Sequence, residues 1–355
     1  MKTRAVLLLL IVSLLALAPA LAQDDSVTLT VITHDSFAAS EDVLAAFEED
    51  TGITVRILRS GDAGTMVNQA VLSRENPLGD VLYGVDNTFL TRALDADLFI
   101  PYESPLLENV PEEFILDPEH RVTPVDYGDV CLNYDAAYFE ENDLPLPESL
   151  ADLTDPIYDG LLVVENPATS SPGLAFLLVT VDQFGADEDE EDGYTYLDFW
   201  ADLVENDVLV ADDWSDAYFG QFSGSGGDGT RPLVVSYASS PPAEVYFAEE
   251  EPEAAPTGSI TAPGTCFRQI EFVGILNGTE HLEAAQQFVD FMLSVEFQED
   301  MPLQMFVFPV NPEAELPEVF ATYAAIPEEP VTMDIAEIDA HREEWIQAWT
   351  ETVLR

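Results

Sequence analysis

Apolar positions recur along this chain in two rhythms, one typical of strands and one typical of helices. Residues 27–33 (VTLTVIT) alternate and are rich in β-branched side chains, which predicts a strand. Residues 40–50 carry apolar side chains at helical spacing. A strand at 54–58, a helix at 65–74 and a strand at 80–86 follow in the same way. This order predicts a parallel sheet with helices on both faces.

A second set of alternating elements lies further along the chain. The patterns predict strands at 161–164 and 233–237, and helices at 172–184 and 196–204. A later segment, 280–297, has one apolar face and is expected to form a single helix. The second set therefore predicts another α/β unit of the same kind as the first.

Two strand-like segments, 126–134 and 266–275, interrupt this order and bracket the second unit. The chain is therefore expected to pass twice between two lobes. The predicted first lobe comprises residues 23–125 and 267–355, and the second comprises 126–266. The expected fold class is α/β, with two lobes joined by two strand-like crossovers. A ligand cleft in such a molecule lies between the lobes, at the carboxyl ends of strands.

Three segments, 62–65, 169–173 and 237–242, each end a strand-like run and open a helix-like run. Each places Ser, Thr or Asp at the position of an N-cap. A helix start leaves backbone N–H groups without partners and has a partial positive charge. If the three starts converge in the cleft, they form a site for hydroxyl or anionic groups of a small ligand. The alternative is that they are ordinary helix caps.

The first 22 residues have the pattern of a secretory signal. Lys2 and Arg4 precede an apolar run at 5–17, and Ala-Leu-Ala at 20–22 forms a cleavage-type ending. The apolar run is short for a membrane span. No cysteine follows the cleavage site, so we expect a periplasmic or extracellular protein without a lipid anchor at that site.

Acidic side chains dominate the composition and narrow the possible partners. The 355-residue chain has 69 Asp and Glu against 11 Lys and Arg, a formal net charge of −58. Nucleic acid binding is excluded because phosphate contacts need clustered basic residues. Two interpretations of the acidity remain open: attraction of cationic ligands, and adaptation to high salt. At high salt only carboxylates inside a cleft select a ligand, because screening removes the effect of distant ones.

The sequence contains two cysteines, Cys131 and Cys266. In an exported protein such a pair suggests a disulfide. Closing so long a loop contributes about 4–5 kcal/mol in the chain-entropy description. The alternative is that one of the two is a free, reactive thiol.

An ordered set of short motifs runs through nearly the whole chain after residue 22. They are THDSF at 33–37, GVDN at 84–87, DYG at 126–128, TSSPGL at 169–174, WSDAY at 214–218, SYASSP at 236–241, FMLS at 291–294 with Gln298, and FPV at 308–310. With these motifs the chain resembles the type II periplasmic substrate-binding proteins of ABC transporters, and more narrowly their thiamine-binding branch. The resemblance implies a bilobed fold and no cofactor.

The resemblance also implies where ligand contacts fall. The implied residues are Asp62, Ala63, Ser170, Ser171, Trp214, Tyr237, Ala238, Ser239, Ser240 and Phe306. Two of these positions depart from the family pattern: Ala63 stands where Gly is familiar, and Phe306 where Trp is frequent. Outside this set, His34 stands where an aromatic residue is usual.

Thiamine has a thiazolium cation, a flat aminopyrimidine and a hydroxyethyl tail that can carry phosphate. A cation favours the face of an aromatic ring, so Trp214 and Tyr237 are the candidates for that contact. The carboxylates of Asp35, Asp62 or Asp126 are candidates for offsetting the charge. The helix start at 170–171 suits the hydroxyl or phosphate end.

The function that follows is a non-catalytic, monomeric binding protein that delivers thiamine or thiamine phosphate to a membrane permease. A second hypothesis is another cation such as ferric iron or a polyamine, although the Tyr-Tyr pair of related iron binders is absent from the sequence. A third is a thiamine-cleaving enzyme of the same fold with Cys131 as nucleophile. The state of the Cys131 thiol separates the third hypothesis from the first.

Overall fold

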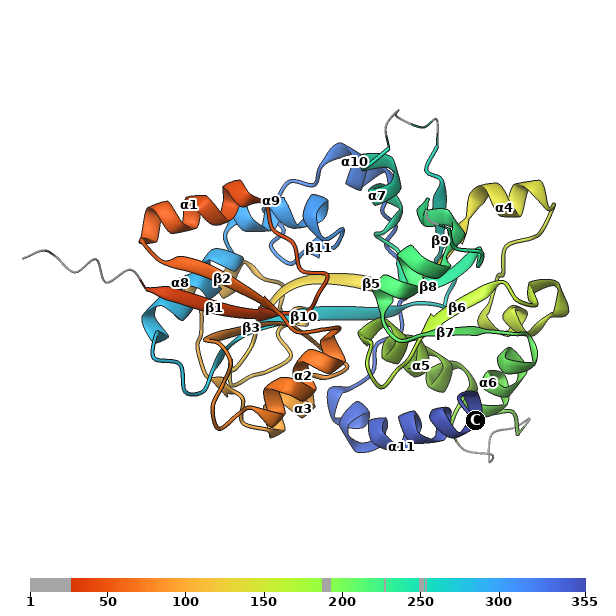
Figure 1. Ribbon diagram of the computed structural model, residues 1–355, viewed down its shortest axis with the longest axis horizontal. Helices are drawn as coiled ribbons and strands as arrows, with labels where there is room; N and C mark the ends of the chain where they lie inside the picture. The colour runs from red at the N-terminus through yellow and green to blue at the C-terminus, as the bar shows by residue number, and fades with distance from the viewer. Residues whose placement is uncertain (1–26, 187–192, 227, 249–251, 253) are drawn as a thin grey trace, which may run out of the picture.

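A computed structural model places the predicted elements in one continuous sheet flanked by helices (Figure 1). The predicted signal at residues 1–22 lies outside the described part of the chain. The described residues are 27–186, 193–226, 228–248, 252 and 254–355. Within them the sheet has 11 strands, with the main order β2-β1-β3-β10-β5-β8-β6-β7.

The first predicted unit is confirmed as the parallel part of the sheet at one end. β1 (Thr28–Thr33) lies between β2 (Thr54–Arg59) and β3 (Val81–Asp86). α1 (Glu41–Thr51) and α2 (Ala63–Leu72) connect these strands. We call this group, with the helices packed on it, the first lobe.

The second predicted unit forms the other end of the sheet and is called the second lobe. β6 (Leu162–Glu165) lies between β8 (Leu233–Tyr237) and β7 (Leu209–Ala211), parallel to both. α5 (Ser171–Phe184) covers this part of the sheet, and α6 (Tyr196–Glu205) packs beside α5. Nearly every residue in the first three turns of α5 is buried, which explains its almost continuous apolar sequence.

Two long central strands join the lobes, as predicted from their strand-like pattern. β5 (Thr123–Asp135) and β10 (Phe267–Leu276) pair antiparallel and run from one lobe into the other (Figure 1). β10 also pairs with β3, and β5 also pairs with β8. Three shorter strands lie off the main path: β4 (Phe99–Ile100), β9 (Thr257–Ile260) and β11 (Phe308–Pro309).

The single helix expected at 280–297 is wrong, because the structure has two helices there. α8 (Leu282–Met292) ends, and α9 (Val295–Gln304) begins after Ser294, whose hydroxyl accepts a hydrogen bond from the Phe297 backbone amide. The apolar spacing continues across the break, so periodicity alone did not locate it. A serine cap supplies a partner for an amide that would otherwise have none.

Further short elements connect these parts. The remaining helices are α3 (Leu90–Asp95), α4 (Ala136–Glu141), α7 (Pro241–Tyr246), α10 (Glu318–Tyr323) and α11 (Ile335–Val353); the 3₁₀ turns are Pro105–Asn109, Glu112–Phe114, Leu150–Thr154, Pro156–Tyr158 and Ser223–Ser225, and a π-helical segment covers Asp216–Gln221.

The C-terminal helix α11 contacts helices of both lobes, α6 in the second and α3 in the first. Trp349 packs edge-to-face against Trp200 with ring centroids 5.5 Å apart. Arg342 donates a hydrogen bond of 3.3 Å to the Thr88 carbonyl.

The division of the chain into lobes at residues 125–126 and 266–267 stays a prediction.

The predicted disulfide is present. Cys131 on β5 and Cys266, just before β10, are bonded, with Cα atoms 4.4 Å apart. Both side chains are buried against Ala238 and Ala325. The bond therefore ties the two crossing strands together where they enter the second lobe.

We expect the double substitution Cys131→Ala with Cys266→Ala to lower the free energy of unfolding by about 4–5 kcal/mol, because the bond closes a loop with a sequence separation of 135. Urea unfolding followed by circular dichroism measures this loss. Reducing the wild-type protein should give a similar loss. A change below about 1 kcal/mol in both experiments would contradict the expectation.

Candidate functional site

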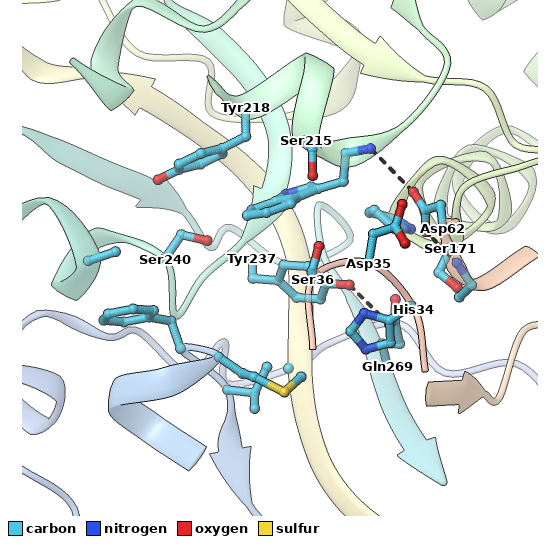
Figure 2. A pocket seen from close by; sticks show the side chains of 18 of the residues that line it. His34, Asp35, Ser36, Asp62, Ser171, Ser215, Tyr218, Tyr237, Ser240 and Gln269 are labelled. Atoms are coloured by element: carbon cyan, nitrogen blue, oxygen red, sulfur yellow. Dashed lines mark hydrogen bonds between the residues drawn. The ribbon is translucent and has the colours of Figure 1, made fainter. Parts of the chain in front are cut away.

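The cleft between the two lobes contains a cavity with a volume of about 530 Å³. Its walls come from the turn after β1, the starts of α2 and α5, the crossing strands β5 and β10, α7, and the segments around Trp214 and Phe306. Figure 2 shows side chains from several of these elements pointing into the same space. Its position agrees with the cleft expected from the order of strands and helices.

The structure brings most of the predicted site residues together around this cavity. Three of them do not line it and have no exposed surface: Ser170, Ala238 and Ser239. Whether any of the predicted residues contacts a ligand stays a prediction. Those that line the cavity are Asp35, Asp62, Ala63, Ser171, Trp214, Tyr237, Ser240 and Phe306.

The three predicted helix starts converge on the cavity. Asp62 caps α2, accepting a 2.7 Å hydrogen bond from the Ala63 amide, and it also accepts one of 3.2 Å from the Trp214 amide. Ser171 lies in the first turn of α5, and Ser240 is the N-cap of α7. Burial raises the pKa of Asp62, and the two amide hydrogen bonds lower it in part.

An aromatic wall lines the second-lobe side of the cavity. The Trp214 ring stacks on Tyr218 with centroids 5.0 Å apart, and it meets Tyr237 at 6.5 Å and Phe219 at 5.4 Å. The indole N–H of Trp214 donates a 3.0 Å hydrogen bond to Ser236, which fixes the ring orientation. This wall presents ring faces and edges to a ligand.

A second aromatic group lies where the lobes meet at the cavity. Phe306 follows α9 in the first lobe, and its ring lies 5.7 Å from Phe247 and 6.2 Å from Tyr246 in the second lobe. Phe306 has φ +55°, a conformation uncommon for a side chain of this size. Phe247 is 71% exposed, so a large apolar surface lies beside the cavity.

Buried polar side chains form the floor of the cavity. Glu271 on β10 lies opposite Asp126 on β5 in the strand register. The Tyr83 hydroxyl donates to Asp126 at 2.5 Å and also lies 3.0 Å from Glu271. Nε2 of His34 lies 3.5 Å from Glu271. The floor is therefore one connected acid–histidine–tyrosine network.

Burial and interactions between neighbouring side chains set the pKa values of the titratable groups in this floor. Burial alone would lower the pKa of His34, but Glu271, with help from Asp62 and Asp86, raises it above its usual value. Burial would raise the pKa of Glu271, but His34 lowers it below its usual value. Burial and the neighbouring Glu271 raise the pKa of Asp126 well above its usual value. Asp126 therefore keeps its proton to a higher pH than an exposed Asp, beside an ionised Glu271.

Direct contacts hold the two lobes together at the edge of the cavity. Besides the bond from the Trp214 amide to Asp62, the Ser171 hydroxyl of the second lobe donates to Asp86 of the first. Burial raises the pKa of Asp86 to about 6. At Gly64 a Cβ atom would lie only 2.7 Å from the Thr169 carbonyl oxygen. The structure thus shows the lobes in close approach.

Carboxyl groups dominate the charge of the cavity lining. Asp35, Asp62, Asp126, Glu244 and Glu271 line it, and no Lys or Arg does so in the described part of the chain. The lining also holds hydroxyl and amide groups. This environment favours a cationic ligand that has polar hydrogen-bonding groups.

Comparison with known proteins decides the family. The family model described as "Bacterial extracellular solute-binding protein" matches residues 76–325. The thiamine-binding periplasmic protein of Escherichia coli strain K12 is 30% identical over 348 residues, covering 96% of this chain and 97% of its own. This chain belongs to the bacterial extracellular solute-binding proteins.

Solved structures of solute-binding proteins agree with this assignment. A periplasmic thiamin binding protein matches with a TM-score of 0.78 and 28% identity over 92% of this chain and 96% of that one. Iron-bound HitA from Pseudomonas aeruginosa matches with a TM-score of 0.71 and 22% identity over 92% and 99%, which shows a shared fold. The fold is therefore that of the type II periplasmic binding proteins, as predicted.

Membership of this family indicates that the protein is an extracytoplasmic solute-binding protein of the kind that serves ABC importers. Such relatives are binding proteins and not enzymes. Among the helices of the described residues, none combines the length and apolarity needed to span a membrane.

Several residues that line the cavity of this solute-binding protein were not predicted from the sequence. Gln269 and Glu271 are polar residues inside the predicted strand at 266–275, and that interruption of an apolar pattern was the available signal. Glu244 and Phe247 follow a predicted helix start by less than two turns and gave no comparable signal. His34 differs from the family pattern, but nothing else in the sequence indicates that it lines the cavity.

We expect Glu271→Gln to lower the pKa of His34, because burial then acts without the opposing carboxylate. In the wild type, the raised pKa of His34 contributes stability that is complete below pH 6.5 and is lost as pH rises through the folded-state value. NMR titration of the His34 ring measures the change, with exposed His341 on α11 as the internal control. An unchanged His34 titration would contradict the assigned pairing.

We expect Gly64→Val to hold the lobes apart, since its side chain would collide with the Thr169 carbonyl and with Phe89. Small-angle X-ray scattering should show a larger radius of gyration than for the wild type. Gln69→Val, at an exposed position of the same helix, is the matched control and should scatter like the wild type. Identical curves for Gly64→Val and the control would show that close approach at Gly64 does not limit closure.

Proposed function

We propose that this solute-binding protein binds thiamine in the cavity between its lobes and delivers it to an ABC permease in the membrane. The observation that carries the proposal is the placement of an aromatic wall beside an acidic floor, in a cavity lined without Lys or Arg in the described residues. A volume of about 530 Å³ is typical of sites for small molecules. The E. coli relative named for thiamine binding supports the choice of ligand.

The aromatic wall suits the thiazolium ring of thiamine. A cation within about 6 Å of an aromatic face is stabilised by roughly 0.5–2 kcal/mol, and Trp is the most favourable ring. Trp214 is held by Ser236 and by stacking on Tyr218, so its orientation is fixed before a ligand arrives. Preorganisation of this kind lowers the entropic cost of binding.

The floor suits a cationic heterocycle with amino and ring nitrogen groups. Glu271 and Asp62 supply acceptors and negative charge, and the Tyr237 hydroxyl is paired at 3.0 Å with the side-chain amide of Gln269 (Figure 2). This pair presents donor and acceptor atoms beside the carboxylates. An aminopyrimidine can exchange hydrogen bonds with both kinds of group.

Other cations are less well matched to these walls. A polyamine would use the carboxylates but would leave flat aromatic surfaces without a flat partner. Ferric iron needs several hard oxygen ligands, and the described residues contain no group of three or more His, Cys, Asp or Glu arranged to hold a metal. The aromatic wall therefore favours a planar organic cation.

The thiamine-cleaving hypothesis needed a free thiol at Cys131. In this structure the Cys131 sulfur is bonded to Cys266, and the side chain is fully buried outside the cavity lining. A disulfide sulfur is not available as a thiolate nucleophile. The disulfide thus supports binding without catalysis.

Thiamine at about 100 times its dissociation constant should stabilise the folded protein by about 2.7 kcal/mol. In a protein of this size that corresponds to a rise of the melting temperature of about 5 °C. Differential scanning calorimetry measures the shift, with spermidine and ferric citrate as comparison ligands. The proposal fails if millimolar thiamine produces no shift, or if spermidine produces a larger one.

Trp214→Ala should weaken thiamine binding about tenfold or more, because it removes the cation–π contact and part of the apolar wall. Trp214→Phe keeps a ring and should weaken binding less. Isothermal titration calorimetry gives both affinities, and thermal unfolding without ligand checks that each variant is folded. Equal affinities of Trp214→Ala and the wild type would remove this residue from the site.

A further inference from the structure

The turn that joins β3 to α3 in the first lobe, residues 86–89, is fixed to one of the central strands. None of its four residues lines the cavity. The Asn87 side chain donates a 3.0 Å hydrogen bond to the Arg268 carbonyl and accepts one of 3.0 Å from the Ile270 amide, both on β10. The 86–89 turn is therefore attached to a strand that joins the lobes.

Two helices that lie outside the first-lobe sheet contact this turn. The Ser171 hydroxyl of α5 and the Thr88 hydroxyl both donate to the Asp86 carboxylate. The Thr88 carbonyl accepts a 3.3 Å hydrogen bond from Arg342 of α11. The Arg342 guanidinium also lies 5.8 Å from the centre of the Phe89 ring. The 86–89 turn is thus a junction between the first lobe, α5 and the C-terminal helix.

The C-terminal helix α11 lies between α3 and α6, at the lower edge of the view in Figure 1. On the second-lobe side, the buried rings of Trp349 and Trp200 pack edge-to-face. On the first-lobe side, Arg342 contacts the 86–89 turn, and Glu343 forms a 2.8 Å ion pair with Arg92 of α3. Buried aromatic packing is harder to separate than an exposed ion pair. We therefore expect α11 to stay with α6 when the lobes move apart, and its polar contacts with the first lobe to break.

Arg342 is only 4% exposed, which is rare for an arginine unless its charge is paired. The carboxylate of Glu343, its neighbour on the helix, lies 3.8 Å away and is largely exposed. Among the residues that the structure describes, the hydrogen-bond acceptor of Arg342 is the Thr88 carbonyl, and the Asp86 carboxylate attracts its charge. The groups that compensate the burial of Arg342 therefore come mainly from the first lobe.

We propose that Arg342 is a positioning residue for lobe closure, because its contact with the 86–89 turn fastens the C-terminal helix across the two lobes. Hinge closure around a ligand is an equilibrium between open and closed arrangements. A contact that exists only in the closed arrangement shifts the equilibrium toward it. Arg342 does not line the cavity, so it acts on binding only through the positions of the lobes. The inference does not depend on which solute is bound.

A spin label on each lobe tests the inference. Gln69 on α2 and Glu205 on α6 are exposed, so the double substitution Gln69→Cys with Glu205→Cys places one label on each side of the cleft. The native cysteines are bonded to each other and do not react with the label. Pulsed electron paramagnetic resonance then gives the distribution of label distances, without ligand and with millimolar thiamine.

We expect Arg342→Ala to shift this distribution toward longer distances. The ratio of closed to open molecules should fall about tenfold, as expected for the loss of a hydrogen bond from a charged group. Arg342→Lys keeps a cation that can donate to the Thr88 carbonyl, so it should restore most of the wild-type distribution. Arg355→Ala removes the same charge at an exposed position just beyond α11, and it should leave the distribution unchanged.

Thermal unfolding checks that each variant is folded. If Arg342→Ala does not fold, Glu343→Gln takes its place, because it removes the ion pair with Arg92 at an exposed position and should lengthen the distances to a smaller extent. Distances equal to those of the wild type, with and without thiamine, overturn the inference and leave the proposed function standing. A wild-type protein that does not bind thiamine overturns the proposed function, while the ligand-free comparison still decides the role of Arg342.

Discussion

The pairing of β5 with β10 is the constraint on which the rest of this structure depends. One antiparallel ladder carries both chain crossings, and the Cys131–Cys266 bond closes it at the second-lobe end. The same register sets Glu271 opposite Asp126 at the floor of the cavity. A slip of β10 by one residue in this register would turn Glu271 to the other face of the sheet and separate it from Asp126. The pairing of β5 with β10 therefore determines both how the lobes are connected and which carboxyl groups meet in the cleft.

Buried carboxyl groups at such a place are costly, and their partners show how the fold tolerates them. An isolated buried charge is strongly unfavourable unless it is paired and hydrogen-bonded. Glu271 has His34 and Tyr83 as partners, while Asp126 relieves the repulsion by a raised pKa. The arrangement keeps negative charge at the floor of the cavity without leaving it unbalanced. The polar floor of the cavity is therefore formed by contacts within the protein itself.

Periodicity in the sequence predicted the longer strands and the helices α1, α2, α5 and α6, because alternation and helical spacing are local. It did not predict the short strands β4, β7, β9 and β11 or the C-terminal helix α11. It failed at Ser294, where a cap divides an apolar pattern that continues across it. It also did not anticipate that α11 would contact both lobes. In the site, the helix starts at Asp62, Ser171 and Ser240 were found because capping is local. Glu271 and Asp126 were not recognised as a pair, since pairing between strands distant in sequence leaves no local pattern.

The net charge of −58 gives little information about the ligand, whereas a few carboxyl groups inside the cleft give much. Surface carboxylates face water and salt, so their field decays within a few ångströms to about 10 Å. Asp62 and Glu244 are partly buried and held by hydrogen bonds, so their positions relative to a ligand are fixed. A chain can thus acquire many acidic residues for solubility in salt without changing what it binds. Inside the cavity the position of each carboxyl group matters, as at Asp62, which both caps α2 and accepts a hydrogen bond from the Trp214 amide of the second lobe.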